Sequence, residues 1–436
     1  MPRNWFASAT LAAWVCLPGA ALGGVEESPR RSSGAEERTA APGQEAEELE
    51  AASASSESGL RLYGFADMSY GRVVADGIGS DDQEVVSTTN GVPRHWAFAI
   101  GNLNLYLDGR LSARARSLAE VRFTYLPGGT QSTVVPDHAQ VLSTTQWGGV
   151  VIERAWVEYT FSDLFTLRAG QFFTPYGIWN VDHGSPVTIA VQKPEITSAQ
   201  LFPERQVGIE GYGTGYLGAA RLGYHLTLSN GRIGDGPAFA NYSGRPGLGA
   251  RLFVEGDWLG ELKLGVSGFT GRHTGLDASD PTAFPVPPDA VTLEFDEYDA
   301  AADVRWEWRS LLVVSELIYQ RVKYTDRGRP LEYVVGPTGP VARLAADHWK
   351  AGSYALGGYR LPYAITPFVM WNLIYQSTGF SNGGLLFPSG LRAVTVGVNF
   401  RPLPALVFKA EYTHVWAPGA SSSTMDLVRG QAAWAF

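Results

Sequence analysis

Residues 298–309 read YDAAADVRWEWR, and two kinds of side chain alternate along them. One set of alternate positions carries no charge (Tyr298, Ala300, Ala302, Val304, Trp306 and Trp308), and the other is rich in charge (Asp299, Asp303, Arg305, Glu307 and Arg309). A period of two residues is typical of a β-strand, because successive side chains point to opposite faces. We therefore expect a strand with one face against an apolar medium and the other against water.

The same alternation recurs along most of the chain, in about sixteen segments separated by breaks. In residues 150–162 we expect the outward set to be Val151, Ala155, Val157, Tyr159 and Phe161. The segments begin near residues 60, 96, 114, 150, 164, 204, 219, 245, 259, 295, 310, 348, 364, 391, 405 and 426.

The connections between these segments alternate in length. Every second one is a tight turn, such as GDWLG (256–260) or RPLPA (401–405), whereas the others run from roughly eight to thirty residues. Short periplasmic turns and long extracellular loops are typical of a transmembrane barrel. Inside lipid every backbone polar group needs a partner, so the sheet must close. The chain is therefore predicted to be all-β, an antiparallel transmembrane β-barrel of about sixteen strands over residues 59–436.

The first residues have the parts of a secretory signal peptide, predicted over residues 1–23. Arg3 supplies the positive charge, residues 6–23 the apolar stretch, and Ala21 and Gly23 the small residues of a cleavage site. Residues 24–58 that follow are acidic and contain no aromatic side chain. Because such a segment buries too little apolar area to fold alone, we expect a disordered periplasmic segment or a short coiled coil.

Composition excludes several classes of protein. The formal net charge is −9, so nothing indicates a nucleic-acid partner, and no long apolar run that would make a membrane helix follows the N-terminus. The only cysteine is Cys16, inside the signal segment, so disulfides are not expected in the mature chain. A lipoprotein signal is the alternative there, but Trp14 and Val15 stand where it requires small residues.

No motif indicates an enzyme, a cofactor or a metal. Gly213, Gly215 and Gly218 match a dinucleotide-binding fingerprint, but the following residues alternate as a strand, whereas that motif needs a helix. Histidine follows aspartate three times, at 137–138, 182–183 and 347–348. Adjacent side chains of an extended chain point in opposite directions, so these pairs predict neither a metal site nor a catalytic pair.

Three features resemble Gram-negative outer-membrane porins, and among these the phosphate-selective porin-like family is nearest. They are LRLYGFADMSYGR (60–72), VTVGVNFRPLPALVFKAEYTHVW (394–416) and the terminal Phe436. The resemblance implies a homotrimer in outer-membrane lipid, forming a channel for small hydrophilic solutes or ions with no chemical step. It also implies that the barrel-assembly machinery reads Phe436, with Trp434 on the same face of the last strand.

The third long connection, residues 174–204, is rich in apolar side chains that must be buried somewhere. Folding into the barrel mouth would bury them and narrow an otherwise wide lumen. The porin resemblance implies the same placement; packing on a neighbouring subunit or loop is the alternative. The predicted constriction residues are Trp179, Asp182, His183, Lys193 and Glu195.

Alternation also places charged side chains on the inner wall. They include Arg122, Arg154, Glu158, Arg168, Arg251, Asp303, Arg305 and Glu307. The arginines are interpreted either as rigid forks that bind phosphate or carboxylate solutes, or as partners of carboxylates that brace the wall. Three functions follow: a general diffusion porin, a phosphate- or anion-selective channel, and a non-conducting structural anchor or adhesin.

Overall fold

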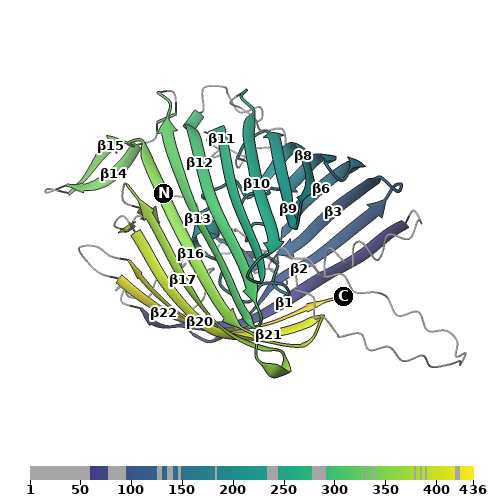
Figure 1. Ribbon diagram of the computed structural model, residues 1–436. Coiled ribbons are helices and arrows are strands. Elements are labelled where there is room, and N and C mark those ends of the chain that lie inside the picture. The colour runs from purple at the N-terminus through teal and green to yellow at the C-terminus, as the bar shows by residue number, and fades with distance from the viewer. Residues whose placement is uncertain are drawn as a thin grey trace, which may run out of the picture.

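Sixteen antiparallel strands close into one barrel (Figure 1). The computed structural model describes residues 59–76, 95–124, 130–134, 141–145, 149–181, 184–232, 244–276, 291–326, 328–329, 331–336, 339–377, 380–382, 385–387, 390–417 and 423–436. The barrel strands are β1 (Gly59–Asp76), β2 (Ala97–Arg110), β3 (Ala115–Thr124), β6 (Gly149–Ser162), β7 (Phe165–Phe173), β8 (Arg205–Leu217), β9 (Ala220–Ser229), β10 (Gly247–Asp257), β11 (Glu261–Leu276), β12 (Val291–Trp308), β13 (Leu311–Tyr324), β16 (His348–Tyr359), β17 (Ile365–Gln376), β20 (Gly390–Leu403), β21 (Leu406–Ala417) and β22 (Ser423–Ala435). The predicted fold class and strand number are confirmed.

The last strand closes the barrel against the first. β22 pairs with β1 from Phe65 opposite Ala435 to Asp76 opposite Met425. Phe436 continues the ladder, because its N–H donates to the Gly64 carbonyl at 2.9 Å and its carbonyl accepts from the Gly64 N–H at 2.9 Å. Gly64 is required there, since a Cβ atom would lie 2.3 Å from the Asn104 carbonyl oxygen. The C-terminal residue is therefore part of the sheet.

Connections alternate in length as predicted. One end of the barrel carries the tight turns 111–114, 163–164, 218–219, 258–260, 309–310, 360–364 and 404–405, with the 3₁₀ turn η1 (Pro362–Ala364) in one of them. The other end carries the long connections. The connection 418–422 is shorter than the eight residues expected, because β22 begins earlier than predicted.

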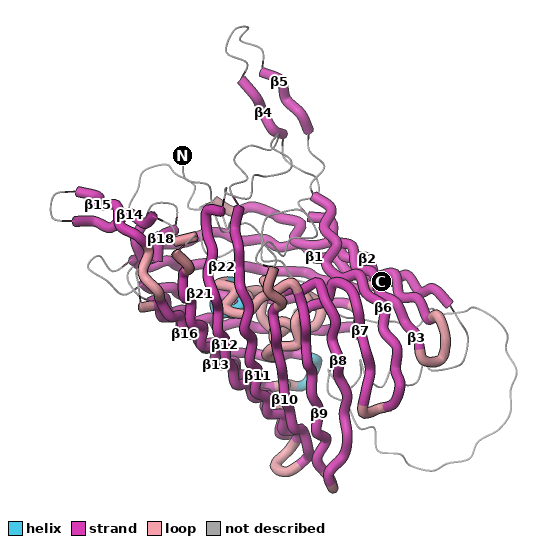
Figure 2. The backbone as a smooth tube through the Cα atoms, turned by 90° about the horizontal axis from the view of Figure 1, so that it is seen from above, coloured by secondary structure: helices cyan, strands magenta, loops and turns pink. Residues whose placement is uncertain are grey.

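Three small hairpins lie in the long connections, and the sequence analysis did not predict them. They are β4 (Thr130–Val134) with β5 (Val141–Thr145), β14 (Leu331–Gly336) with β15 (Gly339–Leu344), and β18 (Phe380–Asn382) with β19 (Leu385–Phe387). The first two project away from the barrel (Figure 2). No helix in the described part of the chain is long and apolar enough to cross a membrane.

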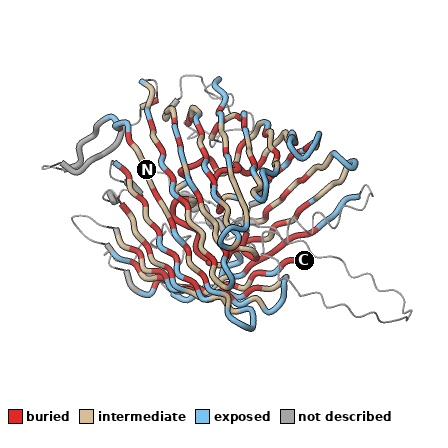
Figure 3. Tube along the Cα trace, viewed as in Figure 1, coloured by how far each residue is buried: buried red, intermediate tan, exposed pale blue. Residues whose placement is uncertain are grey.

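The outer surface is apolar and carries aromatic side chains near both ends of the strands. Buried and exposed positions alternate along the strands (Figure 3). Exposed aromatic residues toward the long-loop end are Tyr70, Phe98, Tyr298, Tyr319 and Tyr412, and those toward the short-turn end are Phe165, Trp308, Phe400, Phe408, Trp434 and Phe436. Trp308 lies ten positions after Tyr298 on β12, about 33 Å along a strand and about 25 Å along the axis at a tilt of about 40°. This matches the apolar band of an outer-membrane barrel.

One prediction about β6 is wrong. Glu120 pairs with Arg154 but Val121 pairs with Ile152, so Glu153 is an extra residue in the ladder, a β-bulge. Val151 lies opposite the buried Arg122 and shares its inward face, whereas Ile152 faces outward and is exposed. Counting alternate residues from the chain alone assumes an unbroken register, and one inserted residue inverts the faces beyond it. The outward positions predicted after the bulge are exposed, as expected.

Cysteine labelling tests which end faces outward. Because Cys16 lies in the predicted signal peptide, a mature chain with Gly339→Cys or Pro404→Cys would carry a single thiol. A membrane-impermeant maleimide is expected to label Gly339→Cys on intact cells and Pro404→Cys only after permeabilisation. Pro186→Cys should not be labelled on intact or on permeabilised cells, since this residue is buried inside the barrel. Labelling of Pro404→Cys on intact cells would reverse the topology.

Candidate pore constriction

The connection between β7 and β8, residues 174–204, lies within the ring of strands (Figure 2). Hydrogen bonds close its neck: the Thr174 N–H donates to the Glu204 carbonyl at 3.1 Å, and the Thr174 hydroxyl to the Pro203 carbonyl at 2.6 Å. The Asn180 side-chain amide donates to the carbonyls of Thr174 and Glu204 at 2.8 and 3.1 Å. The connection therefore enters and leaves the wall at one point. We call residues 174–204 the inner loop.

Apolar side chains attach the inner loop to one side of the barrel. Its buried residues Tyr176, Trp179, Ile196, Leu201 and Phe202 form one cluster with wall side chains of β11, β13, β16, β17 and their neighbours. The wall members are Phe269, Ile318, Tyr354, Leu356, Phe368, Met370 and Ile374. This part of the inner wall is apolar because the loop covers it. Removing this surface from water stabilises the docked position.

Carboxylates of the wall accept hydrogen bonds from the main chain of the inner loop. Glu316 Oε1 accepts from the Trp179 N–H and from the Tyr354 hydroxyl, both at 2.7 Å. On the strand β21, Glu411 accepts from the N–H groups of Val191 at 2.8 Å and Gln192 at 3.0 Å. A loop with little secondary structure has backbone donors that would be costly to bury alone. These two carboxylates provide the acceptors.

Cationic and polar side chains bind the carbonyls of the same loop from other strands. Arg251 Nη1 on β10 donates to the Pro175 carbonyl at 3.1 Å, and Lys409 Nζ on β21 to the Ala190 carbonyl at 3.1 Å. Gln320 Nε2 on β13 donates to the Leu201 carbonyl at 2.8 Å. On β1, Asp67 accepts from the Ser185 hydroxyl at 2.7 Å. Since these strands lie on different sides of the barrel, the inner loop spans the lumen.

The predicted constriction residues lie mainly at contacts between loop and wall. Trp179 is buried, Lys193 is 1% exposed and Glu195 is 4% exposed. Lys193 Nζ is 3.8 Å from Glu204 Oε1. Glu195, the first residue of the short helix α2 (Glu195–Ser198), accepts from Gln192 Nε2 at 2.9 Å and donates its N–H to Asn372 Oδ1 at 3.2 Å. Asp182 and His183 lie outside the described residues.

Every predicted wall charge has a partner of opposite sign. The ion pairs are Arg122–Glu153 at 2.7 Å, Arg154–Glu120 at 2.6 Å, Arg168–Glu158 at 2.8 Å, Arg251–Asp303 at 2.7 Å and Arg305–Glu307 at 2.7 Å. The sequence analysis did not single out Glu153, Arg205 and Glu210, which take part in these pairs, or Arg232 and Glu297, which form a further pair at 2.8 Å. Glu210 and Glu297 sit at alternate inward positions and could have been found from the same pattern. Pairing favours the interpretation that arginine–carboxylate pairs brace the wall.

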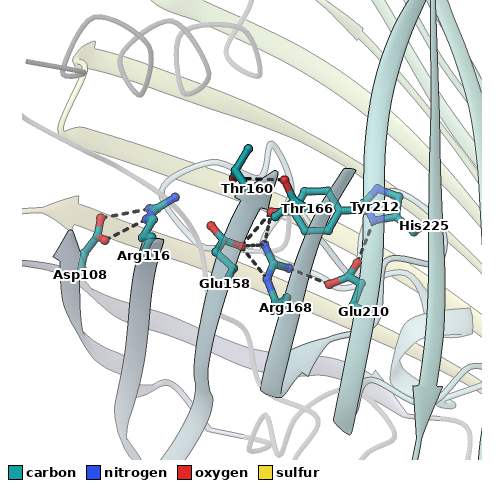
Figure 4. Close-up of polar contacts among 9 residues, drawn as sticks. All are labelled: Asp108, Arg116, Glu158, Thr160, Thr166, Arg168, Glu210, Tyr212 and His225. Carbon is teal, nitrogen blue, oxygen red and sulfur yellow. Dashed lines mark hydrogen bonds and ion pairs between the residues drawn. The ribbon is translucent and has the colours of Figure 1, made fainter. Parts of the chain in front are cut away.

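One group of wall pairs keeps contact with water toward the short-turn end (Figure 4). Arg168 lies between the rings of Trp156 and Tyr212, 4.4 and 4.9 Å from their centres, and its guanidinium also binds Glu210 at 2.8 Å. The side chains of Arg116 and Arg168 are 23% and 20% exposed, whereas Glu316 and Glu411 beneath the inner loop are nearly fully buried. The hydrated part of the described wall therefore includes the inner faces of β3 and β7.

No group of three or more His, Cys, Asp or Glu side chains in the described ranges is placed to hold a metal ion. Many of the carboxylates inside the barrel form ion pairs with arginine or lysine, whereas Glu316 accepts hydrogen bonds from the Trp179 N–H and the Tyr354 hydroxyl.

Comparison with known proteins gives an independent view of the chain. No curated protein matches it. Residues 74–245 match the family described as phosphate-selective porin O and P. The predicted resemblance to porins is confirmed. The matched region runs from the end of β1 to the connection before β10 and includes the inner loop.

Two solved barrels share the fold. The outer membrane channel DcaP of Acinetobacter baumannii is 12% identical, with a TM-score of 0.52, over 87% of this chain and 97% of that one. An anion-selective porin from Comamonas acidovorans is 12% identical, with a TM-score of 0.53, over 87% of this chain and 100% of that one. At this identity the similarity shows a common barrel fold and no more.

Proposed function

We propose that the protein is an outer-membrane porin, a water-filled channel through which small hydrophilic solutes and ions diffuse down their gradients. The observation that carries the proposal is the barrel itself. Its outer face is apolar over the thickness of a membrane, its inner wall is charged, and one loop spans its lumen. The porin resemblance and the barrel fold favour a channel over an enzyme. The place of action is the outer membrane of a Gram-negative bacterium, with lipid around the barrel.

Conductance tests this function directly. The purified protein is added to a planar lipid bilayer, and the current is recorded at constant voltage. Discrete open steps are expected, and the same sample after irreversible heat denaturation serves as the control. Protein that inserts into the bilayer without any current would support the non-conducting anchor or adhesin instead.

Phosphate or anion selectivity is the second candidate, and the family match over residues 74–245 favours it. The Comamonas acidovorans neighbour is itself named an anion-selective porin. The paired wall charges argue against strong anion selectivity, because an arginine paired with a carboxylate attracts a passing anion less strongly. We therefore expect a weak ion preference. The reversal potential in a salt gradient, with and without phosphate, measures it, and block of the current by micromolar phosphate would favour the selective channel.

The proposal also covers the N-terminal segments, the oligomeric state and the assembly signal. Residues 1–23 act as the cleaved signal peptide and residues 24–58 as a periplasmic segment, and the barrels assemble as homotrimers. The barrel-assembly machinery recognises the last strand through Phe436 and Trp434. Their side chains point outward, 50% and 41% exposed, where a recognition surface would need them.

Phe436→Ala is expected to lower the amount of barrel in the outer membrane several-fold while refolding in detergent is nearly unchanged. The substitution keeps both backbone bonds to Gly64, and one interfacial aromatic side chain contributes only about 1.5–3 kcal/mol. Surface yield and refolded fraction are measured side by side. Phe408→Ala, another exposed aromatic near the same end, is the matched control and should assemble normally. Equal losses in both assays would show a purely structural role.

Conductance is expected to rise with pH between about 5 and 7 through Glu195. Burial raises the pKa of this loop carboxyl from 4.5 to about 7, while the hydrogen bond from Gln192 and the charge of Arg429 act in the opposite direction. In the docked loop Glu195 keeps a proton that an undocked loop would release, so docking weakens as the pH rises through this window.

Glu195→Gln should remove this pH dependence. An unperturbed histidine titrates near neutrality, and His183 belongs to the same loop, so His183→Gln is the matched control. A pH dependence that vanishes only in His183→Gln would contradict the assignment to Glu195. Lys193→Glu is a poor test of ion selectivity, because Lys193 is buried beside Glu204 and the substitution would disturb docking.

A further inference from the structure

A compact group of charged side chains faces outward at the long-loop end of β11, β12 and β13. Asp296 lies opposite both Arg272 on β11 and Lys323 on β13. Arg272 binds Asp296 through two hydrogen bonds, Nε to Oδ1 at 2.7 Å and Nη2 to Oδ2 at 2.8 Å. Arg321 lies two residues before Lys323 on the same outward face, opposite Tyr298. We call Arg272, Asp296, Arg321 and Lys323 the outer basic patch.

The patch has an excess of positive charge. Its three cations face two carboxylates: Asp296, which Arg272 engages on both oxygens, and the buried Glu294, whose Oε1 lies 3.9 Å from Arg272 Nη1. Within the described ranges, Arg321 forms no ion pair with a carboxylate, and Lys323 is exposed with its ammonium 5.4 Å from the centre of the Tyr298 ring. The inner wall differs, because each predicted arginine there has its own carboxylate. The chain as a whole carries a net charge of −9, so this local excess runs against its composition.

The patch lies at the level of lipid headgroups. Outward aromatic residues flank it: Tyr298 and Trp349 lie opposite Arg321 on the two neighbouring strands, and Tyr319, two residues before Arg321, stacks on Trp349 at 6.2 Å. Such aromatic side chains mark the boundary between acyl chains and headgroups in outer-membrane barrels. Lys323 and Arg272, both opposite Asp296, lie two residues further toward the long-loop end of these strands. A lipid whose acyl chains pack on these rings would bring its headgroup to Arg321 and Lys323.

We propose that the outer basic patch binds the phosphate groups of a phosphorylated, acylated lipid of the outer leaflet. A phosphate offers several anionic oxygens, which suit one guanidinium fork and one ammonium group two residues apart on a strand. Tyr298 and Tyr319 supply the contact for the acyl chains. The proposal rests on the proposed membrane location, with the long loops outside.

Lipid binding is measured in detergent solution with lipid A that carries both phosphates and with the same lipid after dephosphorylation. EDTA is present so that divalent cations do not bridge the groups, and bound lipid is quantified after gel filtration. Each basic side chain beside an anionic leaflet contributes about 1 kcal/mol, so Arg321→Gln/Lys323→Gln should weaken binding of the phosphorylated lipid on the order of 30-fold. The exchanged pair Arg321→Lys/Lys323→Arg should bind as the native protein does and controls for folding.

Arg309→Gln is the matched control at the opposite rim, since Arg309 lies over the Trp308 ring at 4.7 Å near the short turns. It should bind the lipid unchanged. Equal binding of the dephosphorylated lipid, or unchanged binding by the Gln double variant, would overturn the proposal. Retention of inorganic phosphate alone at the patch would indicate a free-anion site and would also overturn it. Conductance of the double variant in a neutral bilayer should stay at the native value, and a native protein without conductance would contradict the channel and not the lipid site.

Discussion

Removal of residues 177–201 is expected to raise the single-channel conductance at least about two-fold, because the narrowest section of a pore dominates its resistance. The inner loop spans the lumen at the depth of Glu316 and Glu411, so its removal widens this section. The neck makes the deletion feasible. Thr174 and Glu204 are joined by a backbone hydrogen bond of 3.1 Å, and the rings of Tyr176 and Phe202 are 5.0 Å apart, so a short Gly-Ser linker can join residues 176 and 202.

A second deletion, outside the lumen, tests whether removing a segment of the chain changes the conductance by itself. The hairpin of β14 and β15 projects away from the barrel, so a barrel without residues 331–344 should conduct as the native protein does. Both variants must refold to the same content of β-structure before their currents are compared. If the chain without residues 177–201 conducted no better than the native protein, the narrowest section would lie outside the inner loop. The paired charges around Arg168 would then be the better candidate filter.

The sixteen barrel strands could be predicted because each must show lipid one face and water the other. Apolar and polar residues therefore alternate with a period of two in each strand. The long and short connections then indicate which end of the barrel faces outward. The small hairpins lack this requirement. Residues such as 130–134 pair only with 141–145, outside the barrel, so no alternation marked them.

Inward direction could be predicted for the wall charges, but their partners could not. Arg251 on β10 binds Asp303 on β12, across the intervening strand β11. The contact is possible because Gly265 lies between them, where an added Cβ atom would be 2.5 Å from Asp303 Oδ2. A pattern of alternation contains no information about such a gap.

The inner loop shows a different limit. Its apolar content indicated burial, but a loop has no period that assigns each side chain to a face. Lys193 and Glu195 were expected to face the water of the pore, and contacts with Glu204 and Asn372 bury them instead. Asn372 is 177 positions away in the chain, so only the closed barrel brings the two residues together.

Glu411→Ala is expected to release the central part of the inner loop. Glu411 accepts from the N–H groups of Val191 and Gln192 and pairs with Arg429 at 2.9 Å, and all of these groups are buried. Removing one partner of a buried ion pair typically destabilises by about 3–5 kcal/mol, since the remaining charge is left without compensation. That is large compared with the few contacts that hold this part of the loop.

Two measurements detect the release of the inner loop. They are the rate of thermolysin cleavage of the loop in the refolded barrel and the current noise of the open channel. Both should increase strongly in Glu411→Ala and less in Glu411→Gln, which keeps one carbonyl acceptor. Glu255→Ala is the matched control, because Glu255 also pairs with two cations on the inner wall, Arg221 at 2.6 Å and Lys263 at 3.5 Å, but is 26% exposed. An exposed pair contributes about 0–1 kcal/mol, so this variant should behave as the native protein does. If Glu411→Ala remained resistant to thermolysin with a quiet open channel, the apolar cluster around Trp179 and Ile196 would hold the loop alone, and the wall carboxylates would serve only to satisfy its backbone.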